Sequence, residues 1–200
     1  MKKVSIVALL SFAVISSAAF AATEGFYADA DFGQARYSNA TSGFSGASFS
    51  NPNAISIGGG YNFNPYVGVE ADYSSVGDSS LATVRGGASA TEKLKTSSLQ
   101  VAAVGTYPIN NQFSLFGKLG LANTKIDYTA TPGPNTIIVG TTATSGSKTN
   151  LMFGLGGQYN INKQFGIRLQ YQDFGKVQLA GAGSPNIGVK VYSVGGVYNF

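Results

Sequence analysis

Apolar and polar residues alternate with a period of two along most of the chain beyond residue 25. In residues 26–33, for example, Phe26 and Phe32 fall in one phase, whereas Asp29 and Asp31 fall in the other. Successive side chains of a strand point to opposite faces, so this alternation predicts a strand with one apolar and one polar face. The pattern predicts eight strands, at residues 26–33, 55–63, 67–74, 99–107, 113–121, 150–159, 165–172 and 191–200.

The links between the predicted strands alternate in length. Three are short turns, at 64–65, 108–111 and 162–163, and four are long and polar, at 38–52, 76–96, 128–148 and 175–186. Short turns at one end and long loops at the other are typical of even-stranded barrels of the bacterial outer membrane. A soluble β-sandwich also alternates, but it does not require this regular rhythm. We therefore predict an all-β fold, an eight-stranded antiparallel up-and-down transmembrane β-barrel.

A membrane explains why such a sheet would close. In hydrocarbon every backbone N–H and C=O needs a partner within the protein, so a sheet that spans a membrane has to have no edges. Aromatic residues flank the short turns, as expected for a girdle at one membrane boundary. These residues are Tyr61, Phe63, Tyr107, Phe113, Tyr159 and Phe165.

The first 21 residues have the features of an export signal. Lys2 and Lys3 precede a mostly apolar stretch at 4–15, and the segment Ala19-Phe20-Ala21 matches the small-residue pattern of a cleavage site. We place the cut after Ala21, which leaves residues 22–200 as one barrel domain. An uncleaved membrane anchor is the alternative, but its apolar core would be short for that role. Export of such a barrel predicts localisation in the cell outer membrane.

Composition narrows the chemistry. The chain contains no Cys and no His, which removes disulfides, thiolate sites and the commonest general base and metal ligand. Only 11% of the residues are charged, and removal of the leader would leave eleven basic and nine acidic side chains. That balance does not indicate nucleic-acid binding. The carboxylates are scattered along the sequence, so we predict no enzyme, no cofactor and no metal site.

Six charged residues fall on the polar phase of their strands and should point into the barrel: Asp29, Asp31, Glu70, Asp72, Lys118 and Arg168. An unpaired charge in a narrow, poorly hydrated lumen is costly, so we expect a Glu70–Arg168 ion pair with the other four nearby. The acids outnumber the bases by two, so some carboxylates should face water or bind a proton. A polar plug that fills the barrel is the interpretation that we favour, and a narrow path that prefers cations is the alternative.

Several segments resemble the transmembrane barrel of the outer membrane protein A family. They are 64–70 (Asn-Pro-Tyr-Val-Gly-Val-Glu), 107–109, 113–121, 158–159 and 168–171. The chain is also similar in size to the small surface barrels of the OmpX, Ail and Opa kind. The resemblance implies a non-enzymatic surface barrel, and because the sequence stops at Phe200 we do not expect the peptidoglycan-binding domain of the first family.

The resemblance is incomplete inside the barrel. That family carries four inner charged residues that exchange partners during gating, and Glu70 and Arg168 match two of them. Val104 and Gln158 stand where the family has a lysine and a glutamate, so a gating exchange is not carried over. In this family an outward-facing terminal aromatic is also the signal read by the barrel-assembly machinery. The residues that match this signal are Tyr192, Val194, Tyr198 and Phe200.

Basic residues gather in the outer halves of the strands and in the long loops. Of these we expect Arg36, Lys93, Lys95, Lys125 and Lys148 to contact phosphates of lipopolysaccharide, with ordinary solvated charge as the alternative. Apolar residues in two loops, Phe44 and Phe49 in one and 137–139 in the other, offer a contact for a partner protein. For the segment 136–142 a strand extension is the simpler interpretation.

These observations favour a non-enzymatic surface barrel with a structural, envelope-integrity or adhesion role that acts through four long outer loops. The alternative function is a small, nonspecific pore with a weak preference for cations. The expected partners are outer-membrane lipid, lipopolysaccharide, the barrel-assembly machinery and a host or envelope protein. A closed barrel does not need a second copy, so we expect a monomer.

Overall fold

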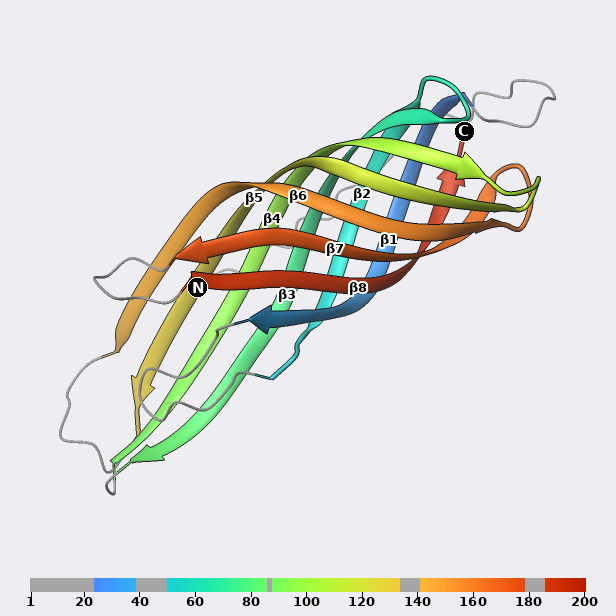
Figure 1. Cartoon of the computed structure of the whole chain (residues 1–200). Coiled ribbons are helices and arrows are strands. Elements are labelled where there is room, and N and C mark those ends of the chain that lie inside the picture. Colours follow the sequence, from blue (N-terminus) through green and yellow to red (C-terminus); the bar gives the residue numbers. More distant parts are fainter. Residues whose placement is uncertain (1–23, 39–49, 86–87, 134–140, 179–185) are drawn as a thin grey trace, which may run out of the picture.

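The computed structural model describes residues 24–38, 50–85, 88–133, 141–178 and 186–200, and the structural statements below concern these residues. They form eight strands in chain order: β1 (Gly25–Ser38), β2 (Asn53–Asn62), β3 (Val67–Arg85), β4 (Ala88–Pro108), β5 (Phe113–Pro132), β6 (Thr142–Asn160), β7 (Phe165–Gln178) and β8 (Asn186–Asn199). Each strand pairs antiparallel with its neighbours in sequence, and β1 also pairs with β8 (Figure 1). The sheet is therefore a closed barrel, which confirms the predicted fold class.

The three short turns share one device. Each contains an asparagine (Asn64, Asn110 or Asn162) whose Oδ1 accepts hydrogen bonds of 2.7–2.9 Å from the backbone N–H groups two and three residues later. A side chain that caps its own turn in this way mimics a backbone turn, which is why asparagine is common there. The predicted positions of these turns are confirmed.

The opposite end of the barrel differs from the prediction. β3 runs to Arg85 and β4 begins at Ala88, so the loop predicted at 76–96 is almost entirely strand. β5 continues to Pro132 and β6 begins at Thr142, which shortens the loop predicted at 128–148. Two of the four predicted loops were thus wrong in length, because polar Ser, Thr and Lys residues also suit a strand that rises into water. Figure 1 shows β3 to β6 reaching beyond the other strands.

Several sequence predictions fall on residues that the structure does not describe. They are the export signal at 1–21, the apolar loop residues Phe44 and Phe49, and the segment 136–140. The described residues include no helix that is long and apolar enough to cross a membrane.

A belt of apolar side chains covers the outside of the barrel. Leu119 of β5 is 65% exposed and Leu169 of β7 is 63% exposed, although both lie in the middle of their strands. Near the short turns, aromatic rings pair across neighbouring strands, for example Phe113 with Tyr159 at 4.7 Å between centroids. A second set stands at the other side of the belt, where Tyr171 and Tyr192 are 5.0 Å apart. Two aromatic girdles that flank an exposed apolar belt are the arrangement of a lipid-facing surface.

The inside of the barrel has two different regions. Charged and amide side chains occupy the half nearer the short turns, which continues the predicted polar phase. The half nearer the outer hairpins instead contains a buried apolar cluster, which corrects the expectation that the lumen is polar throughout. The cluster consists of Ala35, Ala54, Val76, Leu94, Ala102, Ala122, Ile126, Met152, Phe174, Val177, Ile187, Val189 and Val191.

Candidate functional site

The six charged residues predicted to point inward do so, and each is at most 6% exposed. They come from alternate strands: Asp29 and Asp31 from β1, Glu70 and Asp72 from β3, Lys118 from β5 and Arg168 from β7. The strands between them present small residues at the same levels. Gly58 of β2 lies between Asp29 and Asp72 in the ladder, and Gly195 of β8 lies between Asp31 and Arg168.

These glycines make the convergence of the charged side chains possible. A Cβ atom on Gly58 would overlap the Asp72 carboxylate, and one on Gly195 would overlap that of Asp31. The interior of an eight-stranded barrel is only wide enough to be filled by side chains. Long charged residues on alternate strands therefore need small residues on the strands between them.

Arg168 is the centre of the network. Its Nη1 is 2.9 Å from Glu70 Oε2, its Nη2 is 3.3 Å from Asp31 Oδ2, and the same Nη2 forms an ion pair with Asp29. Gln170 of the same strand donates a hydrogen bond of 2.9 Å from Nε2 to Asp31 Oδ2. The guanidinium is planar and carries five donors, so it can serve three carboxylates at once.

Lys118 forms the second positive position. It makes an ion pair with Glu70, and its Nζ is 3.8 Å from Asp72 Oδ2. Tyr27 adds a hydrogen bond of 2.8 Å from its hydroxyl to Glu70 Oε2, so both oxygens of Glu70 are engaged. Lys118 lies directly across the ladder from Val104, at the level where the resemblance would place a lysine on the neighbouring strand. The sequence pattern could not show this, because the two positions meet only through the strand register.

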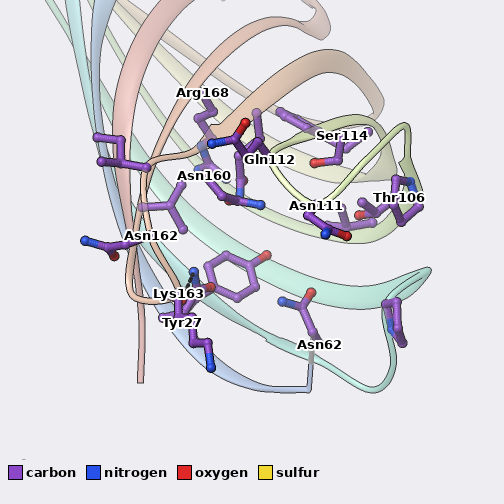
Figure 2. A pocket seen from close by; sticks show the side chains of 18 of the residues that line it. Tyr27, Asn62, Thr106, Asn111, Gln112, Ser114, Asn160, Asn162, Lys163 and Arg168 are labelled. Carbon is purple, nitrogen blue, oxygen red and sulfur yellow. Dashed lines mark hydrogen bonds between the residues drawn. The ribbon is translucent and has the colours of Figure 1, made fainter. Parts of the chain in front are cut away.

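A cavity opens beside this network at the end with the short turns. It has a volume of about 530 Å³, and its wall includes Tyr27, Glu70 and Arg168. The rest of the lining is rich in amides, among them Asn62, Asn111, Gln112 and Asn160 (Figure 2). We refer to this cavity as the vestibule. It gives the charged network access to the solvent on the side of the short turns.

Beyond the charged network, the lumen is filled by a hydrogen-bonded layer and then by the apolar cluster. In that layer Gln100 donates from Nε2 to Ser74 Oγ at 2.9 Å, and the Ser74 and Ser56 hydroxyls are 2.7 Å apart. Leu94, Ile126 and Phe174 of the cluster have no exposed surface. Above them, burial and the neighbouring Glu92 carboxylate raise the pKa of Tyr128 to about 12, so its phenol is neutral at neutral pH.

The basic residues predicted to contact lipopolysaccharide fall in three places. Lys93 and Lys95 of β4 and Lys125 of β5 are exposed on the outer face of the extended hairpins. Arg36 of β1 is also on the outer face, on the opposite side of the barrel, and lies over the ring of Tyr192 at 5.5 Å. Lys148 is also exposed, but it pairs in the ladder with Thr124, whose side chain is buried, so it lies on the inward phase of β6.

The four residues of the predicted assembly signal lie at the seam where β8 meets β1. Tyr192 and Val194 face outward, 47% and 46% exposed, and Tyr198 contacts the ring of Phe200 at 5.0 Å. The Phe200 N–H donates to the Phe26 carbonyl at 3.0 Å, so the end of the chain is held against β1.

Comparison with known proteins adds a family and a set of similar folds. A family model described as an outer membrane protein beta-barrel domain matches residues 6–200. No curated protein matches the chain.

Solved structures that resemble the barrel include the attachment invasion locus protein Ail, a Neisserial surface protein and the outer membrane protein OprG. Ail of Yersinia pestis, in complex with the heparin analogue sucrose octasulfate, is 22% identical with a TM-score of 0.56, over 88% of this chain and 99% of that one. Neisserial surface protein A is 16% identical with a TM-score of 0.60, over 88% and 97%. OprG of Pseudomonas aeruginosa is 14% identical with a TM-score of 0.52, over 91% and 99%. At identities this low, the likeness to these structures shows a shared fold and nothing more.

Proposed function

This chain belongs to the outer membrane β-barrel family, and on that premise we propose that it is a non-enzymatic, non-conducting surface barrel whose outer hairpins bind anionic groups at the cell surface. The observation that carries the proposal is the pairing of a filled lumen with a basic outer rim. Such a barrel would support the envelope through lipopolysaccharide and would also present a surface for adhesion.

The filled lumen supports a structural role over transport. A solute that enters the vestibule meets the Arg168–Glu70 ion pair, whose two side chains are almost fully buried. Behind it lie the buried amide and hydroxyl groups, and then apolar side chains such as Leu94 and Phe174 with no exposed surface. An ion would have to leave its water shell to pass an apolar layer, which is strongly unfavourable.

The basic rim supports binding of phosphates at the outer leaflet. Arg36 lies over Tyr192 of the outer aromatic girdle, and directly opposite Arg36 in the ladder is Lys190. Lys95 of β4 and Lys125 of β5 also face outward, three strands away around the barrel from β1 and β8, beyond the apolar residues Leu99 and Leu121. Cations just above an aromatic girdle stand at the height of lipid headgroups, where charge-assisted hydrogen bonds to phosphate are favoured.

The same rim suits a sulfated or phosphorylated glycan on a host surface. The Ail structure contains a heparin analogue, which is a densely anionic ligand. That observation belongs to Ail, and it supports anionic glycans as the ligand class to test for adhesion by this barrel.

The test is binding of purified deep-rough lipopolysaccharide to the refolded barrel, measured by isothermal titration. Replacement of Lys93, Lys95 and Lys125 by Ala should weaken binding at least tenfold and lower its salt dependence. Lys163→Ala removes an equally exposed lysine at the short-turn end and serves as the matched control. Equal affinities for the triple variant and the control would contradict the proposal.

A small pore is the second candidate, and the vestibule is the observation in its favour. Its wall reaches Glu70 and Arg168, so the rest of the charged network and the upper lumen are what separates it from the outer end of the barrel. Planar-bilayer recordings separate the two functions. We expect no steady conductance from the wild type, whereas large, stable channels that Glu70→Gln leaves unchanged would support the pore.

A further inference from the structure

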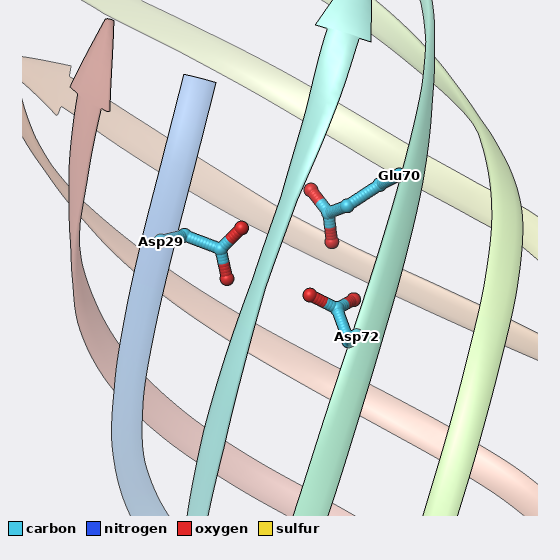
Figure 3. Close-up of side chains that lie close together, drawn as sticks. All are labelled: Asp29, Glu70 and Asp72. Atoms are coloured by element: carbon cyan, nitrogen blue, oxygen red, sulfur yellow. The ribbon is translucent and has the colours of Figure 1, made fainter. Parts of the chain in front are cut away.

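Three carboxylates converge over a strand that contributes no side chain beneath them. Asp29 comes from β1 and Glu70 and Asp72 come from β3, and all three point toward one another across β2 (Figure 3). The residue of β2 that lies between Asp29 and Asp72 in the ladder is Gly58. A Cβ atom there would overlap Asp72 Oδ1, so the absence of a side chain keeps this space open.

The carboxylate oxygen atoms of this triad are close together, and some of them have no hydrogen-bond partner. One oxygen from each carboxylate lies within 4.8 Å of those of the other two. Asp72 Oδ1 and Asp29 Oδ1 are buried without a hydrogen-bond partner, whereas Asp29 Oδ2 forms an ion pair with Arg168. Each of these aspartates is 6% exposed, so water cannot freely solvate them. Buried carboxylate oxygens without donors are costly.

The charges of the network also do not balance. The four acids Asp29, Asp31, Glu70 and Asp72 face the two bases Lys118 and Arg168, and all six are buried. Both bases form ion pairs with Glu70, and Arg168 also forms ion pairs with Asp29 and Asp31. Asp72 is left with Lys118 at 3.8 Å as its nearest described cation. With all four acids ionised, the network carries two negative charges that these bases do not balance, which is the charge that one divalent cation would compensate.

We propose that Asp29, Glu70 and Asp72 form a site for one divalent cation of the calcium type inside the barrel, over the glycine face of β2. Calcium binds six to eight oxygen ligands, mostly carboxylates and amide or backbone carbonyls. Gln100 is the candidate for a further oxygen ligand, because it lies directly across the ladder from Asp72 and its Oε1 is buried without a hydrogen-bond partner. The sequence pattern assigned the three carboxylates to the inner face, but it could not show that Asp29 of β1 meets Glu70 and Asp72 of β3 over Gly58, because this follows from the strand register.

The vestibule provides the entry path. Glu70 belongs both to the triad and to the vestibule wall, so an ion that enters from the side of the short turns would meet the triad first at Glu70 and would not have to cross the apolar cluster. The amide-rich lining carries few charges that would capture the ion on the way.

The test uses the full mature chain, refolded in detergent micelles without lipopolysaccharide and treated with a chelator. Metal analysis after dialysis against Ca²⁺ should give one equivalent of bound Ca²⁺ per chain. Tb³⁺, an analogue of Ca²⁺ with tyrosine-sensitised emission, should give a signal that saturates at one equivalent and that excess Ca²⁺ abolishes. Tyr27 is the sensitiser next to the site because its hydroxyl contacts Glu70, and the chain contains no Trp.

Two variants locate the ion. Asp72→Asn keeps the shape of the side chain, lowers the surplus charge and should reduce Ca²⁺ affinity at least tenfold, with native heat-modifiable gel mobility. Asp127→Asn removes an aspartate on the outer face of β5 and should leave binding unchanged. Absence of stoichiometric Ca²⁺ from the wild type would overturn the proposal without any variant, and so would equal binding by the wild type and Asp72→Asn.

Discussion

The same strands have opposite amphipathicity in the membrane and above it. In the membrane part of β4, Leu99 and Val101 face outward and Gln100 faces inward. Nearer the outer end of the same strand, Lys93 and Lys95 face outward and Leu94 faces inward. The outward side meets lipid in the first region and water in the second, whereas the inside is shielded from both. The comparison shows that the outer solvent, and not the strand, decides which face is apolar.

The inversion also explains why the lumen has two kinds of filling. On β8, Tyr192 and Val194 face outward beside the membrane, and Val189 and Val191 fill the interior above it. Inside the membrane part, charges are held by ion pairs around Arg168. Above it, the interior contains the apolar cluster together with a few buried polar residues such as Glu92 and Thr96. Side chains fill the lumen in both regions, but substitutions in the two regions should change the stability of the barrel differently.

The largest effect is expected for the charged half of the lumen. Arg168→Met leaves Asp29, Asp31 and Glu70 buried without their guanidinium and should lower the free energy of unfolding by about 3–5 kcal/mol. Urea unfolding in micelles, followed by circular dichroism, measures this loss. Arg36→Met on the exposed outer face is the control and should cost well under about 1 kcal/mol. Similar losses for both variants would contradict the central role of Arg168.

A lipid-facing lysine tests the boundary of the inversion. Leu119→Lys places a charge on the outer face in the middle of the membrane part and should cost about 2–4 kcal/mol. Thr91→Lys also introduces a lysine on the outer face, on β4 above the membrane, where water already meets the polar side chain, and should have almost no effect. Unfolding in lipid vesicles is the measurement. Equal losses of stability at both positions would mean that the lipid-facing belt does not end between the levels of Leu119 and Thr91.

The apolar cluster can be tested by a cavity. Leu94 has no exposed surface, so Leu94→Ala removes buried methyl groups and should cost about 2–3 kcal/mol. Leu99→Ala, five residues further along β4, truncates a side chain that faces lipid, and lipid can fill the gap, so its cost should be smaller. The order would be reversed if the upper lumen were a hydrated channel, because water would then occupy the space left by Leu94.

The periodicity of the sequence was sufficient to predict the strands and the inward charges. Alternation is a local property, so Asp29, Glu70 and Arg168 could each be assigned to the inner face from a few neighbours. The geometry of the network could not be predicted in this way. Lys118 reaches Glu70, and Asp29 meets Asp72 across Gly58, only because of the stagger of strands that are distant in sequence.

The outer hairpins were missed for a different physical reason. The prediction assumed that an outward face is apolar, and the segment with outward Lys93 and Lys95 was therefore interpreted as a loop, while the strand that contains Lys125 was ended at residue 121. The signal was present in the inverted pattern, in which Leu94 and Ile126 alternate with these lysines. Alternation with the opposite phase indicates a strand that has left the membrane.

The smallest effect on stability is expected for an exposed ion pair above the membrane, which can be compared with a buried ion pair in the lumen. Lys125 and Asp127 are 3.1 Å apart on the outer face above the membrane, with side chains 55% and 45% exposed, whereas those of Lys118 and Glu70 are 1% exposed. In water the attraction of such a pair is largely offset by solvation and side-chain entropy. Lys125→Ala should therefore change stability by less than about 0.5 kcal/mol, and a double-mutant cycle with Asp127→Ala should give a coupling that vanishes in 1 M salt. A coupling above about 1.5 kcal/mol that persists in salt would mean that the pair is shielded from water, and the upper boundary of the lipid-facing belt would then lie above Lys125.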